Sequence, residues 1–90
     1  MTTKSFSTIF SSAYRLTPGD TDPEHLRLLI DISSIRSDKI INALNDYFIL
    51  GESRADVCKK HNVNQGYLSL KIRELQELSG RVYRLFPYYI

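Results

Sequence analysis

Apolar residues recur with the period of an α-helix along most of the chain. The first clear example is Leu26, Leu29 and Ile30, which fall at i, i+3 and i+4 and predict a short helix over residues 24–33. No Val-, Ile- or Thr-rich run alternates with polar residues in the way that a half-buried strand does. The pattern therefore predicts an all-α fold, a small helical domain.

The residues ahead of this helix keep no sustained period. They are rich in Ser and Thr and contain a Pro-Gly pair and a further proline, which are typical of turns and loops. We therefore expect residues 1–23 to form a mostly irregular amino-terminal arm and residues 24–90 to form the helical domain.

A second helix is predicted from Ser37 to about Leu50. Ser37 is a good N-cap because its hydroxyl can accept a hydrogen bond from a free amide of the first turn, and Asp38 complements the helix dipole there. Gly51 suits the left-handed position that commonly follows a helix end. The helix carries one apolar stripe, formed by Ile40, Leu44, Tyr47 and Phe48.

Residues 53–75, with the sequence SRADVCKKHNVNQGYLSLKIREL, predict two helices around a very short turn. Ser53 can cap the first helix, which extends to about His61, and Asn64 can cap the second. Only two residues remain between the first helix and the cap of the second. This tight corner is typical of a helix-turn-helix.

The corner has the residue types that a helix-turn-helix scaffold needs. A small residue lets the second helix cross the first closely, a residue tolerant of left-handed backbone makes the turn, and an apolar residue fills the space beneath it. The second helix would bury the face that carries Leu68, Ile72 and Leu75, at i, i+4 and i+7. The expected scaffold residues are Cys58, Asn62, Val63, Leu68 and Ile72. A helical hairpin with no nucleic-acid role is the alternative.

The opposite face of the second helix predicts contacts with DNA, because a recognition helix presents its amino-terminal residues to a groove. Asn and Gln amides can pair with adenine edges, and Arg can pair with guanine or phosphate. Leu70 could meet a thymine methyl group, or it could pack against the carboxyl-terminal segment. The expected DNA-binding residues are Arg54, Asn64, Gln65, Gly66, Ser69, Leu70, Lys71 and Arg73.

The distribution of charge supports this interpretation more than the net charge of +2 does. Between Ser53 and Arg73 five basic residues accompany one acid, a local charge of +4, whereas residues 20–38 carry a local charge of −3. A basic block of this kind attracts phosphates, although a solvated helix surface has the same composition. Lys59 and Lys60 in particular fit either role.

Membrane and metal-binding classes find little support in the sequence. The 90 residues make one domain, and no apolar stretch approaches the roughly 20 residues of a membrane helix. The start of the chain lacks the continuous apolar core of a signal peptide. The single cysteine, Cys58, excludes an internal disulfide and gives no metal-binding set. We therefore expect a cytoplasmic protein without a membrane partner, a metal or a cofactor.

An enzyme is not expected either. His25 and His61 have no Cys, Ser or carboxylate at a catalytic spacing, so both are interpreted as lone surface histidines. An acidic cluster ahead of the first predicted helix lacks the spacing of a calcium loop, and it is interpreted as helix amino-terminal charge. No small-molecule ligand is inferred. The cluster consists of Asp20, Asp22 and Glu24.

The segment LLIDISSIRSDKIINALNDYFILGESRADVCKKHNVNQGYLSLKIREL, with the later RLFPYY, closely resembles the PapB-type regulators of bacterial fimbrial (adhesin) operons. The resemblance rests on the blocks ISSI, SRADVC, NQGY and PYY, which recur in the same order in that family. It covers roughly residues 26–89, and the first 25 residues do not visibly match.

This resemblance implies a bacterial transcription factor that controls a fimbrial gene cluster. Family members bind double-stranded A/T-rich DNA near the operon promoter, act as oligomers, and can activate or repress. The block SRADVC implies that Arg54 and Cys58 matter for DNA binding. The residues themselves favour a contact role for Arg54 and a packing role for Cys58, and they leave open whether the major or the minor groove is read.

An apolar excess near the first predicted helix indicates a homo-oligomer, a dimer or larger. Six large aliphatic residues lie within ten positions, more than a short helix can turn toward one small core. An exposed apolar patch usually marks an interface, and the expected interface residues are Leu28, Ile32 and Ile35. The carboxyl-terminal RLFPYYI is either a second such surface or a cap on the domain's own core.

A protein-interaction module that modulates another regulator without binding DNA is the competing class of function. The unusually apolar segment LRLLIDISSI favours it. Retardation of an A/T-rich duplex at moderate salt would discriminate the two classes.

Overall fold

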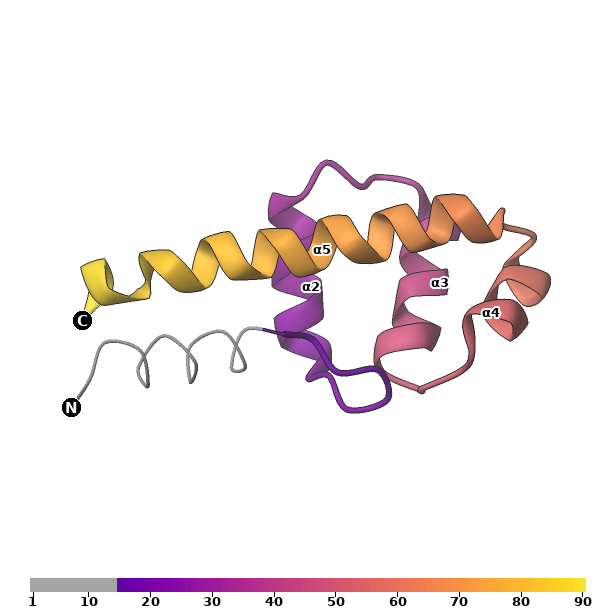
Figure 1. Ribbon diagram of the computed structural model, residues 1–90, viewed down its shortest axis with the longest axis horizontal. Helices are drawn as coiled ribbons and strands as arrows, with labels where there is room; N and C mark the ends of the chain where they lie inside the picture. The colour runs from indigo at the N-terminus through magenta and orange to yellow at the C-terminus, as the bar shows by residue number, and fades with distance from the viewer. Residues whose placement is uncertain (1–14) are drawn as a thin grey trace.

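The structure, a computed structural model, describes residues 15–90, and the first part of the predicted arm, residues 1–14, lies outside the described residues. The described range contains four α-helices, one short 3-10 helix and no strand, so the all-α fold is confirmed. The elements are α2 (Pro23–Ile32), α3 (Asp38–Phe48), α4 (Arg54–His61), α5 (Gln65–Leu85) and η1 (Phe86–Tyr89). Figure 1 shows α5 as a long rod that crosses α2, with α3 and α4 beside its amino-terminal half.

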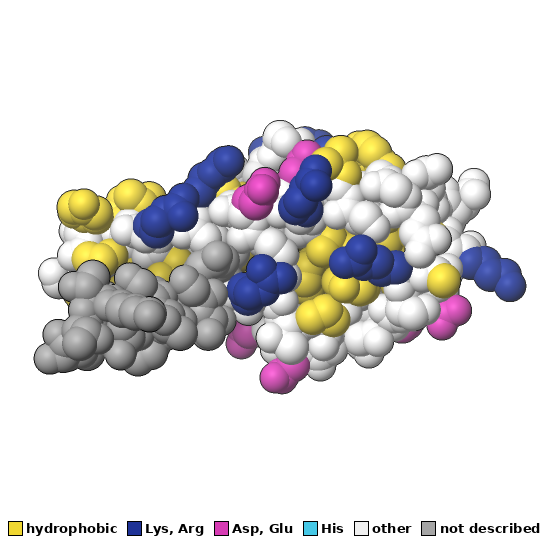
Figure 2. All heavy atoms as spheres, in the orientation of Figure 1, with side chains coloured by type: hydrophobic (Ala, Val, Ile, Leu, Met, Phe, Trp, Pro, Cys, Tyr) yellow, Lys and Arg dark blue, Asp and Glu magenta, His cyan; other side chains and the backbone are white. Residues whose placement is uncertain are grey.

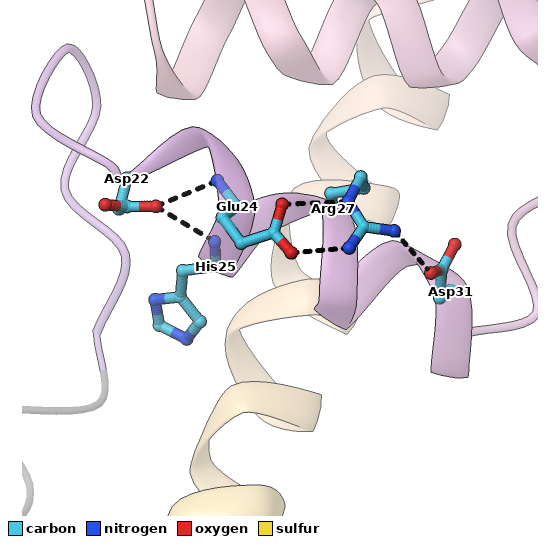
Figure 3. Close-up of polar contacts among 5 residues, drawn as sticks. All are labelled: Asp22, Glu24, His25, Arg27 and Asp31. Atoms are coloured by element: carbon cyan, nitrogen blue, oxygen red, sulfur yellow. Dashed lines mark hydrogen bonds and ion pairs between the residues drawn. The ribbon is translucent and has the colours of Figure 1, made fainter.

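Each α-helix of the described range begins at a side chain that caps it. Ser37 accepts a hydrogen bond from Ile40 N, Ser53 accepts one from Asp56 N, and Asn64 accepts one from Tyr67 N. The three predicted N-caps are therefore confirmed. At α2 the cap is Asp22, whose Oδ1 accepts hydrogen bonds from the amides of Glu24 at 2.8 Å and His25 at 3.2 Å (Figure 3).

Charged side chains along α2 form ion pairs with one another. Arg27 donates to Glu24 and, at 3.1 Å, to Asp31 (Figure 3). The hydrogen bond from Arg27 lowers the pKa of Glu24 below its ordinary value. Among the described residues no group of three potential metal ligands occurs. Asp22 caps α2 and Glu24 lies in its first turn, so these two acids of the cluster contribute charge to the start of the helix, as predicted.

One hydrophobic core joins all four α-helices. The predicted inward face of α2 is buried, and in α3 the stripe is buried except for the half-buried Tyr47. The largest fully buried side chains come from every helix, which makes the core common to the whole domain. They are Leu26, Leu44, Phe48, Val57, Leu68 and Leu75.

The loop before α2, residues 15–22, has no helix, but it packs as part of the domain. Leu16 is only 4% exposed and belongs to the core, and Thr21 is also buried. The amides of Gly19 and Thr21 donate to the carbonyl of Phe48, at 2.9 and 3.2 Å. This loop therefore closes over the carboxyl-terminal end of α3.

Two glycines allow that closure. α3 ends at Phe48, earlier than the predicted Leu50, and Gly51 follows with a φ of +75°. Gly19 has a φ of +79°, and a Cβ on it would lie 3.2 Å from the Cα of Gly51. Gly51 therefore serves a close backbone approach as well as the turn that the sequence predicted.

The last α-helix extends beyond residue 75, where the predicted helix-turn-helix ends. α5 continues for 21 residues and passes through Ser79 and Gly80, both of which are buried. In Figure 1 its carboxyl-terminal part extends beyond α2, α3 and α4. Within residues 15–90, no helix combines the length and apolar character needed to span a bilayer.

Candidate nucleic-acid interface

The corner between α4 and α5 has the predicted turn. Asn62 adopts the left-handed conformation with a φ of 55°, the one non-glycine residue of the described range to do so. Its amide and that of Val63 both donate to the carbonyl of Cys58. Val63 packs half-buried against the core. The Lys39 ammonium group adds a contact that the sequence did not reveal, since it donates to Asn62 O at 3.0 Å.

A polar cluster fixes α4 to α3. Asp46 Oδ2 lies 2.5 Å from His61 Nε2 and 3.0 Å from Lys60 Nζ, and Lys60 also reaches Glu52 at 3.5 Å. The hydrogen bond to His61, reinforced by Lys60, lowers the pKa of Asp46. His61 is therefore a half-buried structural residue, so its interpretation as a lone surface histidine is wrong. Lys60 is paired with two acids of the protein, Asp46 and Glu52.

The buried face of α5 is the predicted one, with Leu68, Ile72 and Leu75 all at most 4% exposed. On the other side, Gln65 and Gly66 are exposed at the amino-terminal tip. A Cβ on Gly66 would come within 3.2 Å of Asn64 Oδ1, the atom that caps the helix. The glycine at position 66 therefore leaves room for the capping side chain of Asn64, and it leaves the backbone at the start of α5 accessible.

Lys71 and Leu70 differ in how available they are. Lys71 is half-buried, donates to Glu74 at 3.1 Å and lies 5.1 Å from the Tyr67 ring centroid. The hydrogen bond to Glu74 raises the pKa of Lys71. Leu70 is 37% exposed near the start of α5, whereas η1 follows its far end, on the order of 20 Å away along the helix. Packing of Leu70 against the carboxyl-terminal segment is therefore wrong.

Arg54 connects three helices. Its Nη1 donates to Ser69 Oγ of α5 at 3.0 Å, and its Nε donates to the Tyr47 hydroxyl of α3 at 3.4 Å. The guanidinium carbon also lies 5.5 Å from the Tyr47 ring centroid, a cation–π distance. These contacts hold an exposed charge in one place, which reduces the entropy lost when it meets an anion.

An open groove of about 860 Å³ runs between the loop before α2 and the outer face of α5. Arg15, Arg54 and Arg73 line it, and Glu77 is the one acid among the lining residues. None of the three arginines forms an ion pair with an acid among the described residues. Figure 2 shows Lys and Arg side chains around a hydrophobic hollow in the middle of this face.

The predicted DNA-binding residues thus fall into three groups. Arg54, Ser69 and Arg73 share the groove. Asn64, Gln65 and Gly66 form the tip of α5, and Leu70 and Lys71 lie outside the lining of the groove. The sequence analysis did not identify the remaining polar and aromatic residues of the groove, because nothing in their local patterns indicates that they meet. They are Arg15, Thr17, Tyr47, Gln76 and Glu77.

The predicted interface residues do not all face outward. Leu28 is 51% exposed and Ile32 is 61% exposed. Ile35 is only 5% exposed, so its placement on the outer side is wrong. Ile35 lies in the turn after α2, and its side chain lines a small pocket together with Leu75 and Leu78 of α5.

Comparisons with known proteins agree on one class. The family model described as adhesin biosynthesis transcription regulatory protein, PapB, matches residues 1–89. Regulatory protein FanB of Escherichia coli is 57% identical over 74 residues, which are 82% of this chain and 75% of FanB. The E. coli major pilu subunit operon regulatory protein PapB is 46% identical over 74 residues, 82% of this chain and 71% of PapB. The crystal structure of E. coli FocB superposes with a TM-score of 0.77 at 40% identity, covering 97% of this chain and 99% of FocB.

These similarities define the class as transcriptional regulators. The chain belongs to the adhesin biosynthesis transcription regulatory protein (PapB) family. The family match begins at residue 1, so the expectation that the first 25 residues fall outside the resemblance is wrong. Membership in a family of operon regulators points away from an enzyme.

Proposed function

We propose that the protein regulates a fimbrial or adhesin operon by binding double-stranded DNA, with α4 and α5 acting as a helix-turn-helix. The observation that carries this proposal is the groove beside α5, where Arg54 and Arg73 form no ion pair with a described acid. Guanidinium groups bind phosphate through paired hydrogen bonds, and phosphate contacts dominate affinity for DNA. Related proteins are named as regulators of adhesin and pilus operons, which supports the target.

Roles within the site follow from position. The tip of α5 carries Asn64, Gln65 and Gly66, which suits base-edge contacts, and the Asn64 amide nitrogen remains for this because Oδ1 caps the helix. Arg54 and Arg73 suit phosphates. Ser69 is a positioning residue for Arg54, and Leu70 and Lys71 are contacts at the rim. We propose A/T-rich, promoter-proximal sites, activation or repression according to the site, and action in the cytoplasm.

Binding is expected to depend steeply on salt. If four to six phosphates are neutralised per protomer, the log–log slope of affinity against salt concentration should be roughly −4 to −5. A fluorescence-anisotropy titration of an A/T-rich duplex at several salt concentrations measures this slope. A slope near zero, or no retardation of the duplex, would refute the DNA proposal and favour a protein-interaction module.

We also propose that the protein is a dimer or larger. Leu28 and Ile32 leave large apolar side chains exposed on α2, and a single helix-turn-helix gains specificity when protomers bind neighbouring sites together. Leu28→Glu with Ile32→Glu is expected to shift the protein toward monomer in sedimentation velocity. Leu50→Glu is the matched control, because Leu50 is equally exposed, at 63%, but lies outside this surface.

The sedimentation experiment has a clear negative result. A wild-type protein that is strictly monomeric at micromolar concentration, both free and on a duplex with several sites, contradicts the proposed oligomer. Equal shifts in the Leu50→Glu control and in the α2 variant would show that the effect is not specific to α2.

A further inference from the structure

The loop before α2 is fastened to α5 through one residue. Leu16 N donates to Gln76 Oε1 at 2.8 Å, and Gln76 Nε2 donates back to Leu16 O at 2.8 Å. The side-chain amide of Gln76 thus satisfies both the backbone N–H and the backbone carbonyl of Leu16. The Leu16 side chain is meanwhile buried in the core. Both anchors hold the preceding residue, Arg15, beside α5.

The other end of the loop is fixed as well. Gly19 and Thr21 bind the carbonyl of Phe48, and within the loop Asp20 N and Thr21 Oγ1 both donate to Thr17 O. The segment is irregular in conformation, but its backbone is hydrogen-bonded at both ends. A loop that is already held in place loses little conformational freedom when it contacts a ligand.

Arg15 shares its groove with the two arginines of the proposed site. Of the basic residues outside the groove, Arg27, Lys60 and Lys71 pair with an acid, whereas Arg36, Lys39, Lys59, Arg81 and Arg84 form no ion pair within the described residues. What distinguishes the arginines of the groove is that three of them without an ion pair come from three separate segments and line one groove. Three guanidinium groups and one carboxylate, that of Glu77, give the open groove an excess of positive charge, which matches a partner with a row of negative charges. In a DNA-binding protein, the sugar-phosphate strand is that partner.

We propose that one sugar-phosphate strand of the bound duplex lies in this groove, so that the loop before α2 forms a second wall of the DNA-binding surface. Arg15 contacts a phosphate, and Gln76 positions Arg15 by holding Leu16. The inference rests on the proposed DNA binding and adds a segment that lies outside the helix-turn-helix.

The test compares salt titrations of the full chain on an A/T-rich duplex. Arg15→Gln is expected to weaken binding several-fold, up to about tenfold near 0.1 M salt, and to make the log–log slope shallower by about one. Arg27→Gln is the matched control, because it removes the same charge from α2 outside the groove. That control should keep the wild-type slope.

A second variant tests the positioning role. Gln76→Ala removes no charge, yet it should reproduce the loss and the shallower slope of Arg15→Gln, because the loop is released. The double variant should bind no more weakly than either single variant, as expected for residues that act together. Hydrogen exchange at the Leu16 amide should accelerate in Gln76→Ala, and circular dichroism should show an intact helical fold.

The outcomes separate this inference from the proposed function. Binding by the wild type with an unchanged affinity and slope in Arg15→Gln overturns the inference and leaves DNA binding intact. Additive losses in the double variant, or wild-type binding by Gln76→Ala, overturn the positioning role. If Gln76→Ala unfolds, the exposed Arg15→Gln still decides the contact. A wild type that binds no duplex overturns both.

Discussion

Replacement of Cys58 by Gln is expected to lower the free energy of unfolding by about 2–4 kcal/mol and to abolish DNA binding with it. Cys58 is buried in the core, and its carbonyl accepts the amide of Val63 at the turn. The longer Gln side chain would overpack this corner, and its amide group would be buried without a hydrogen-bond partner. Thermal denaturation followed by circular dichroism, with anisotropy on the same samples, measures both effects.

Cys58→Ala is the control for this substitution. It keeps the position small and apolar, so stability should fall by only about 1 kcal/mol and DNA binding should persist. Loss of binding by Cys58→Ala with the melting temperature unchanged would contradict a pure packing role. The thiol would then take part in binding directly, as the family resemblance allows.

Arg54→Ala is expected to weaken DNA binding about tenfold and to make the salt slope shallower by about one, with the fold intact. Arg54 is exposed and is held over Tyr47 by its bond to Ser69, so the change removes a preorganised charge rather than a part of the core. Salt titration of the same A/T-rich duplex gives the affinity and the slope. Circular dichroism and the melting temperature report on the fold.

Two controls define what the Arg54 result means. Arg27→Ala removes an equal charge from outside the groove and should leave the slope unchanged. Ser69→Ala removes one of the hydrogen bonds that hold Arg54 and should cause a smaller loss of affinity without a change in slope. An Arg54→Ala protein that binds like the wild type would remove Arg54 from the proposed interface.

The features that the sequence predicted correctly are local ones. Ser37, Ser53 and Asn64 could be identified as N-caps because a cap needs only its own side chain and the next three residues. The left-handed Asn62 followed from the short distance between two helical patterns. The buried face of α5 followed from the helical period of its apolar residues.

The features that it missed depend on contacts between distant segments. Leu16 and Gln76 meet only because the loop folds over α3 onto α5, and neither residue has an apolar period that shows this. His61 gave no sign of its partner, because Asp46 lies on a different helix. Ile35 was placed outside because a count of apolar residues ignores the turn that reverses the chain after α2. The groove is built from such contacts, so its outline could not be drawn from the sequence alone.

The approach of Gly19 to Gly51 has a consequence for how this chain tolerates mutation. A Cβ on either glycine would fall within 3.0–3.2 Å of the other's Cα, and both residues have positive φ, so replacing either one alone already disrupts the contact. In a library of single substitutions selected for folded protein, both positions should be depleted of almost every other residue. The second substitution should then cost less than the first, because the loop and the end of α3 have already separated. Two positions far apart in the chain would thus behave as one site under selection.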